Sequence, residues 1–389
     1  MRLAELDSIL SRIIDAYPHV SDINLTVGRP LQVEAFGKLV PVQLNLSSKI
    51  LTPFQTETIA LNLIRSDRRK METLLQEGSC DFAHSIQDRI RFRVNIFSQR
   101  NNYSIVMRKL PVEIPTVEQL DLPLVLKKMS REKNGIIFFT GATGTGKTTS
   151  LAAILNEINE SLPVHIITLE DPVEIVHPHK KATLNQRELG TDFDSFSHGL
   201  RSALRQAPKV ILVGEIRDRE TMEIALAAAE TGILVFSTLH TIDTTQTLNR
   251  ILGFFDHSEE KQIRIRLAGA LRWVVSQRLL PRIDQGRLAV LEILVNSLRI
   301  QDLILNGETE DKTFYEVIET SQPLGCQTFD QDIIAKFQQG LISEETAMLF
   351  ASKRSMVQRG LDEIKSRRGE KTTDIEGLRM DQDYTKSKR

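Results

Sequence analysis

The segment that decides the fold runs from Gly135 to Thr149 and reads GIIFFTGATGTGKTT. Its apolar first part predicts a buried parallel strand, and the Ala- and Leu-rich residues 147–158 predict a helix. The glycine-rich turn between them matches the P-loop pattern G-x-x-x-x-G-K-[ST] at every position. Such a turn can precede a helix by chance, but a strand before it and a helix after it are the context that the pattern requires. We therefore predict a nucleotide-binding site.

The residue types in this turn suit a triphosphate and its metal ion. Glycines let the backbone curl so that successive N–H groups, and the N-terminus of the following helix, point at phosphate oxygens. Lys147 is placed to reach the β- and γ-phosphates, and the Thr148 hydroxyl is placed to ligate Mg²⁺. The predicted nucleotide-binding residues are Gly141, Ala142, Thr143, Gly144, Thr145, Gly146, Lys147, Thr148 and Thr149.

Composition and charge restrict the class of protein. A chain of 389 residues, 41% hydrophobic and 26% charged, is long enough for two or three ordinary globular domains. Its net charge of −1 gives no overall basic field for nucleic acid or anionic lipid. Cys80 and Cys326 form no zinc motif and indicate a reducing compartment. No apolar run approaches the ~18–20 residues of a spanning helix. We expect a cytoplasmic protein that reaches a membrane only through a partner.

Residues 1–110 are expected to form a compact α+β domain. An amphipathic helix is predicted at 3–16, and a capping box with proline at the first helical position begins another at Thr52-Pro53-Phe54-Gln55. In the last part of the domain, alternation predicts strands that bury apolar side chains and leave Arg91 and Arg93 facing out. The strands are expected near residues 22–27, 80–86, 90–98 and 103–109.

A second domain is expected at residues 117–357, after an extended, proline-stiffened linker at 111–116. Apolar runs separated by helical patterns predict a parallel α/β sheet. From about residue 261 the sequence predicts helices only, the first with Ile263, Leu267, Leu271 and Val274–Val275 on one face. A charged tail, predicted to be mobile or a docking peptide, occupies 358–389. Strands are expected at 136–140, 164–169, 210–214 and 233–238, and the later helices at 297–306, 327–339 and 343–357.

Acidic residues follow two of the predicted parallel strands. Glu170, Asp171 and Glu174 come after the strand 164–169, at the sheet edge where ligands of such sheets bind. One of these acids could orient or deprotonate the attacking water, although acids at a strand end are often solvated loop residues. Glu215 follows the strand 210–214 in the pattern of a Walker B acid that holds Mg²⁺, where Asp is more usual; the alternative is a capping acid for the next helix.

Basic side chains complete the candidate site. His240 follows the strand 233–238 and could sense the γ-phosphate, although a lone histidine is more often structural. Ring-forming ATPases often use an arginine from a neighbouring subunit, since a planar guanidinium matches phosphate. Most arginines are ordinary surface charges. The candidates are Arg93, Arg108, Arg201 and Arg205, of which the last two are four residues apart on a predicted helix.

Together these motifs resemble the secretion ATPase superfamily, most closely the type IV pilus retraction ATPases of the twitching-motility class. GATGTGKTTS, TLEDPVE, NQRELG, LRSALR, VGEIRD, AAAETG and TLHT occur in that order, and the resemblance runs from Ser21 to about Ala351. It implies a PAS-like N-terminal domain and a RecA-like P-loop ATPase core with a helical C-terminal part, assembled as a hexameric ring. It also implies ATP hydrolysis with Mg²⁺ and an inner-membrane platform protein as partner.

The resemblance also implies roles for the candidate residues. Lys147 and Thr148 would bind phosphate and Mg²⁺, Glu174 would be the catalytic base, and Glu215 would be the Walker B acid. His240 would belong to a histidine motif. Arg93 and Arg108 match arginines of the N-terminal domain that reach the nucleotide, and Arg201 and Arg205 match a pair that follows the acidic motif.

Several positions depart from the family pattern. The retraction signature Ala-Ile-Arg-Asn-Leu-Ile-Arg-Glu reads LRIQDLIL at residues 298–305, and changes also occur at Asn24, 207–209 and Ile233. The leading hypothesis is a motor that powers pilus retraction. The alternatives are an accessory ring subunit that binds ATP and modulates a paralogous pilus motor, or the ATPase of a related secretion or DNA-uptake machine. Direct contact with nucleic acid is not expected, because no basic-aromatic tract is present.

Overall fold

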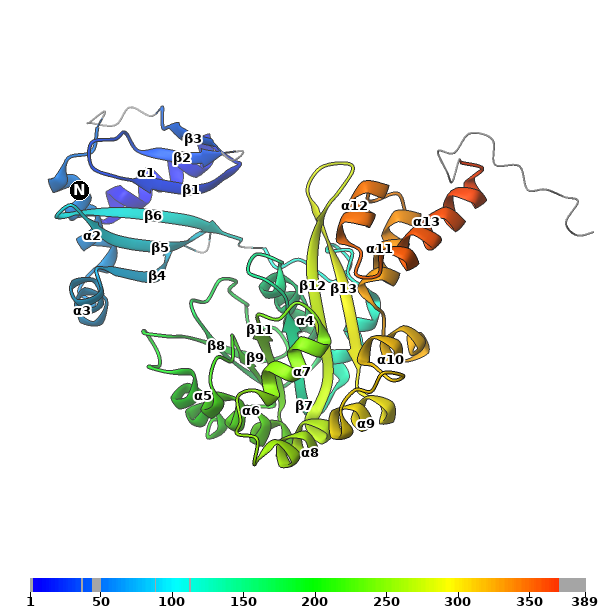
Figure 1. Cartoon of the computed structure of the whole chain (residues 1–389). Helices are drawn as coiled ribbons and strands as arrows, with labels where there is room; N and C mark the ends of the chain where they lie inside the picture. Colours follow the sequence, from blue (N-terminus) through cyan, green and yellow to red (C-terminus); the bar gives the residue numbers. More distant parts are fainter. Residues whose placement is uncertain (1–2, 36–37, 44–49, 88, 112, 371–389) are drawn as a thin grey trace, which may run out of the picture.

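The computed structural model describes residues 3–35, 38–43, 50–87, 89–111 and 113–370. Within these ranges the chain forms an N-terminal α+β unit and a larger α/β unit, each built on one sheet (Figure 1). The predicted mixed α/β class is confirmed. The described part of the chain contains no helix that is long and apolar enough to cross a lipid bilayer.

The N-terminal unit is an antiparallel sheet with the strand order β3-β2-β1-β6-β5-β4. In β4 and β5 buried side chains alternate with more exposed ones, and the buried side chains of the sheet pack with those of α1 and α2 in one core that includes Phe92 and Ile23. The predicted capping box is present, because Thr52 Oγ1 accepts a hydrogen bond from Gln55 N and Gln55 Oε1 accepts one from Thr52 N. The elements are α1 (Leu3–Ala16), β1 (Val20–Leu25), β2 (Gln32–Ala35), β3 (Lys38–Pro41), α2 (Pro53–Ile64), α3 (Arg68–Glu77), β4 (Ser79–Ile86), β5 (Ile90–Gln99) and β6 (Asn102–Leu110).

The larger unit is a twisted sheet with the strand order β13-β12-β7-β11-β10-β8-β9, parallel except for β13 at one edge. The strand that begins the P-loop segment, β7, is buried on both faces. Ile136 and Phe138 pack toward one layer of helices, and Ile137 and Phe139 toward the other. The elements are η1 (Leu124–Arg131), β7 (Gly135–Thr140), α4 (Lys147–Ser161), β8 (His165–Glu170), β9 (Thr183–Glu188), α5 (Phe196–Leu204), β10 (Val210–Val213), α6 (Arg219–Glu230), β11 (Leu234–Leu239), α7 (Thr244–Leu252), α8 (Glu260–Ala270), β12 (Leu271–Pro281) and β13 (Arg287–Val295).

The expectation of helices only after residue 261 is wrong for residues 271–295. The helix α8 ends at Ala270, and the chain continues as β12 and then β13. The β-branched pair Val274–Val275 and the neighbouring Trp273 favour a strand, which pairs with β7 on one side and β13 on the other. Apolar residues spaced three and four apart across α8 and β12 were mistaken for one helical face.

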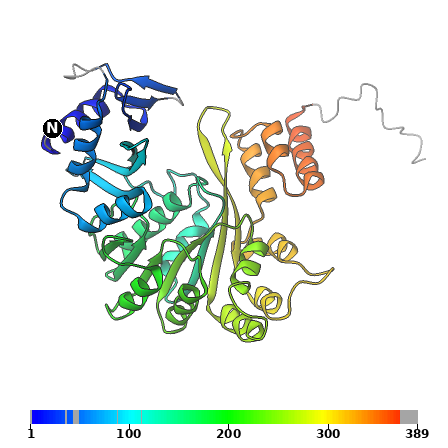
Figure 2. The same ribbon diagram turned by 60° about the vertical axis from the view of Figure 1, so that its left-hand side comes forward.

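The remaining helices follow β13 in the chain and are coloured from yellow to red in Figure 2. The prediction of a helix at 343–357 is corrected, because α12 ends at Phe350 and a new helix begins at Arg354. That helix runs to Arg368, past the point where the charged tail was predicted to begin; residues 371–389 of the predicted tail lie outside the described residues. The helices are α9 (Leu298–Asn306), α10 (Phe314–Thr320), η2 (Gln322–Leu324), α11 (Phe329–Gln338), α12 (Glu344–Phe350) and α13 (Arg354–Arg368).

Candidate nucleotide site

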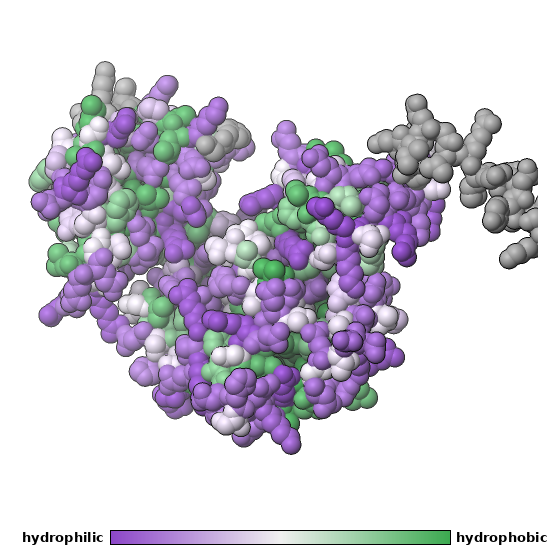
Figure 3. All heavy atoms as spheres, viewed as in Figure 1, coloured by the Kyte–Doolittle hydropathy of each residue, from purple (hydrophilic) through white to green (hydrophobic). Residues whose placement is uncertain are grey.

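The candidate site is a cavity of about 800 Å³ where the carboxyl ends of the parallel strands meet the N-terminal unit. The molecule is visibly hollowed between the two units (Figure 3). Because β7, β8, β10 and β11 are parallel neighbours, the residues that follow each of them reach the same sheet edge. The sheet edge therefore contributes four separate parts of the sequence to the site, and the N-terminal unit contributes further residues.

The P-loop follows β7 and is shaped by glycines with positive φ. Gly141 has a φ of 144°, and a Cβ there would lie 2.4 Å from the backbone oxygen of Gln277. Gly146 has a φ of 84°, and its Cβ would lie 2.9 Å from Gln277 Nε2. Both positions thus require glycine, because β12 passes directly against the loop.

The P-loop lysine is held close to its own loop. Lys147 is the first residue of α4, and its Nζ donates hydrogen bonds to the carbonyl oxygens of Gly141 and Ala142 at 2.8 and 2.9 Å. Burial lowers the pKa of Lys147, and the nearby carboxylates of Glu215 and Glu174 oppose this shift. The P-loop and the acids that follow β8 and β10 therefore share one electrostatic environment.

Gln277 is a site residue that the sequence interpretation missed. Its side chain is buried, Nε2 donates to Thr145 O at 2.6 Å, and Oε1 accepts from Ser150 Oγ at 2.8 Å. The side chain thus connects the P-loop to the first turn of α4. It was missed because its segment was interpreted as part of a helix, so that nothing placed it beside β7.

The segment of residues 171–178, here called the acidic loop, follows β8. Glu174 lines the cavity together with Asp171 and with Glu170 at the end of β8, but the Glu170 side chain is buried. Glu170 Oε1 accepts hydrogen bonds from Thr168 Oγ1 at 2.6 Å and Gln186 Nε2 at 2.9 Å. Burial raises the pKa of Glu170, and the hydrogen bonds from Thr168 and Gln186 oppose this shift. The structure therefore distinguishes Glu170 from Glu174 by burial, which their positions after the strand did not predict.

The acid after β10 lies beside the histidine after β11. Glu215 Oε2 is 3.4 Å from His240 Nε2, and Glu215 Oε1 is 2.6 Å from Arg217 Nη2. Thr238 Oγ1 at the end of β11 donates to Gly214 O at 2.6 Å and so ties the two strand ends together. Arg217 is a second contact that sequence reasoning did not identify, although it stands two residues from Glu215.

The candidate arginines divide into two groups. Arg93 and Arg108 of the N-terminal unit line the cavity, where Arg93 lies 3.5 Å from Asp81 and Arg108 Nε donates to Asp22 at 2.9 Å. Arg201 and Arg205 do not line it. Arg201 pairs with Glu220 at 2.8 Å, and Arg205 is an exposed residue at the C-terminal end of α5.

The oxygen donors suit a magnesium–nucleotide complex rather than a protein-caged metal. Mg²⁺ takes one or two protein oxygens and completes its shell with water and phosphate. Thr148 and Glu215 offer a hydroxyl and a carboxylate on the same cavity. Among the residues described, no group of three or more His, Cys, Asp and Glu side chains is placed to hold a metal. The donor set therefore fits Mg²⁺ bound together with a triphosphate.

Acid pH should weaken the fold through His177 in the acidic loop. Burial lowers the pKa of His177 to about 4, so its contribution to stability is present above pH 6.5 and is lost as the pH falls through about 4. The loss amounts to at most ~3 kcal/mol. Thermal unfolding measured from pH 7 to pH 4 should show a shallower decline for His177→Gln. The same substitution at the solvent-exposed His257 should leave the decline unchanged, and equal curves for His177→Gln and wild type would contradict the assignment.

A P-loop, a Walker B-type acid and a further acid at the carboxyl edge of a parallel sheet define a P-loop ATPase with a RecA-like core. Residues 72–365 match the family of type II/IV secretion system proteins. The chain therefore belongs to that family.

Similar proteins agree with this assignment. The chain is 41% identical over 332 residues to the type IV pilus ATPase PilU of Pseudomonas aeruginosa, which covers 85% of each chain. It is 39% identical over 330 residues to the type IV pilus retraction ATPase PilT of the same organism, which covers 84% of this chain and 93% of that one. The crystal structure of the pilus retraction motor PilT with bound ADP superposes with a TM-score of 0.81 at 39% identity, over 91% of this chain and 98% of that one.

Proposed function

We propose that this chain is an ATP-hydrolysing motor that powers type IV pilus retraction as a homo-hexamer. The observation that carries the proposal is the cavity itself, which brings the P-loop, the acids after β8 and β10, and arginines of the N-terminal unit to one site. Likeness to PilT and PilU over most of the chain supports the pilus assignment. The expected location is the cytoplasmic side of the inner membrane, through a platform protein of the pilus machine.

The candidate residues that line the cavity take different parts in phosphoryl transfer. Lys147 and the P-loop N–H groups bind the β- and γ-phosphates, and Thr148 and Glu215 hold Mg²⁺. When bound, Mg²⁺ neutralises the charge that develops on the phosphate oxygens. Glu174 orients the attacking water and accepts its proton, because it lines the cavity and lies close enough to Lys147 to affect the pKa of that residue. His240 contacts the second oxygen of Glu215 and positions that carboxylate.

The arginines complete the site in two ways. Arg93 and Arg108 reach the cavity from the N-terminal unit and offset transition-state charge. Arg201 and Arg205 act from a different surface, where a neighbouring subunit of the ring would meet them. Because the nucleotide lies between the two units, hydrolysis changes the angle between them about a hinge at residues 111–116. That motion is passed to the platform protein.

Pilus imaging in the source organism tests this function. Deletion of the gene is expected to leave surface pili that no longer retract, with retraction restored by the wild-type gene and not by Glu174→Gln. Unchanged retraction in the deletion strain, or loss of the pili themselves, would contradict a retraction motor.

A second candidate is an accessory ring subunit that modulates a paralogous pilus motor. The helix α9 carries the altered signature, and its first residue, Leu298, is 83% exposed. The altered signature on this exposed part of α9 favours a partner other than that of a standard retraction motor. Tight ATP binding with turnover no faster than that of Glu174→Gln, together with co-purification of a paralogous ATPase, would favour this function.

A further inference from the structure

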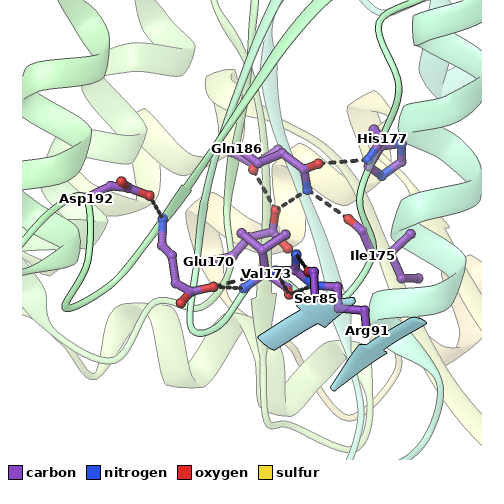
Figure 4. Close-up of polar contacts among 10 residues, drawn as sticks. Ser85, Arg91, Glu170, Val173, Ile175, His177, Gln186 and Asp192 are labelled. Carbon is purple, nitrogen blue, oxygen red and sulfur yellow. Dashed lines mark hydrogen bonds and ion pairs between the residues drawn. The ribbon is translucent and has the colours of Figure 1, made fainter. Parts of the chain in front are cut away.

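The acidic loop is fixed to the core by two residues of β9. Val173 N donates to Glu188 Oε2 at 3.2 Å. Gln186 Nε2 donates to Ile175 O at 2.8 Å, and Gln186 Oε1 accepts from His177 N at 2.8 Å (Figure 4). Backbone groups on both sides of Glu174 are therefore hydrogen-bonded to a strand of the parallel sheet.

A third attachment comes from the N-terminal unit. Arg91 on β5 donates from Nε and Nη2 to the single acceptor Val173 O, at 3.2 and 2.9 Å. Its Nη1 donates to Ser85 Oγ at 3.2 Å, and its Nη2 lies 3.8 Å from Glu188 Oε2. Figure 4 shows the guanidinium group of Arg91 between Ser85 on the N-terminal unit and Val173 on the acidic loop.

This contact is buried, unlike an ordinary surface pair. The Arg91 side chain is only 19% exposed, although strand alternation predicted that it faces out. Burial lowers the pKa of Arg91, and the acids Glu188 and Glu170 oppose the shift. A buried guanidinium that lost its acceptors would carry an uncompensated charge, so the contact resists separation.

The contact of Arg91 can affect catalysis because its acceptor, Val173 O, lies directly beside Glu174 in the chain. Val173 O belongs to the peptide group whose nitrogen is that of Glu174, so movement of Arg91 moves the backbone that carries the Glu174 carboxylate. We propose that Arg91 is a positioning residue that places Glu174 for attack only when the N-terminal unit is seated against the core. The inference rests on the proposed role of Glu174 as the base. It makes hydrolysis dependent on the angle between the two units.

A second contact between the units supplies the matched control. Arg69 on α3 lies 3.3 Å from Asp194, and the two side chains are 62% and 75% exposed. Such an exposed pair contributes little. Arg69→Met therefore removes an arginine that crosses the same interface without touching the acidic loop.

The test compares steady-state ATP turnover and equilibrium ATP binding of the full chain in five variants: Arg91→Met, Arg91→Lys, Arg69→Met, Glu174→Gln and the double variant Arg91→Met/Glu174→Gln. Arg91→Met is expected to lower kcat at least ~10-fold while the Kd for Mg-ATP changes less than ~3-fold, and Arg69→Met should leave both unchanged. In the Glu174→Gln background, Arg91→Met should not lower kcat any further, because Arg91 acts through the Glu174 carboxylate, which this background already lacks. Arg91→Lys, which keeps the charge but cannot give two hydrogen bonds in a fork, should be intermediate.

The outcomes separate this inference from the proposed function. If Arg91→Met lowers turnover equally in the wild-type and Glu174→Gln backgrounds, or weakens ATP binding as much as kcat, Arg91 is structural and the inference is wrong. If Arg91→Met does not fold, the Arg91→Lys variant is measured in both backgrounds and decides in the same way. If Glu174→Gln alone leaves turnover unchanged, Glu174 is not the catalytic base and the proposed mechanism is wrong at that point, whatever the result for Arg91.

Discussion

Glu174→Gln is expected to lower ATP turnover by a factor of about 10²–10⁴, the range that general-base catalysis contributes. Glutamine keeps the size of the side chain and its ability to orient a water molecule, but it cannot accept a proton at neutral pH. ATP binding should stay within a few-fold of wild type, since the phosphates are held by the P-loop. Steady-state phosphate release and equilibrium binding of Mg-ATP measure the two quantities.

Glu170→Gln is the matched control, because it makes the same chemical change at the other end of the same motif. Burial raises the pKa of Glu170, so glutamine removes a carboxyl whose charged form is disfavoured by its surroundings. Its Oε1 can still accept from Thr168 and Gln186. Turnover should fall less than ~3-fold. A loss in Glu170→Gln that equals the loss in Glu174→Gln would contradict the division of roles between the two acids.

Lys147→Ala is expected to weaken ATP binding at least ~100-fold and to reduce turnover below detection. A hydrogen bond to a charged group contributes about 1.5–3 kcal/mol, and Lys147 is placed to contact two phosphates. Alanine is a strong helix former, so α4 should still begin at this position. Titration with a fluorescent ATP analogue, with Lys128→Ala on the exposed side of η1 as control, measures the effect. If Lys147→Ala bound the ATP analogue with wild-type affinity, the P-loop would not be the site that holds the phosphates.

Much of the sheet could be predicted from the sequence, and the reason is local. The strands β7, β8, β10 and β11 are short apolar runs bounded by turn residues, and a strand buried on both faces requires that pattern. The residues that follow them reach one edge because parallel neighbours end on the same side. Motif spacing thus placed Lys147, Glu174, Glu215 and His240 near one another before any coordinates.

The missed features depend on contacts between distant segments. β12 has apolar spacing that also fits a helix, and only pairing with β7 and β13 decides between them. Gln277 contacts the P-loop only because β12 pairs with β7. Arg91 follows the outward pattern of β5, and its burial arises from the acidic loop, 82 residues later in the chain. Alternation along one strand carries no information about what covers its outer face.

The central claim, that this chain is a catalytic ring rather than an ATP-binding accessory, is tested most directly by one measurement. The purified full-length protein is fractionated by size with its molar mass recorded, and ATP turnover is measured in each fraction. Six copies of 44.1 kDa give about 265 kDa. The account predicts that turnover coincides with this mass and is lost in the same fraction of Glu174→Gln. A six-fold ring that binds ATP but turns it over no faster than that variant would contradict it.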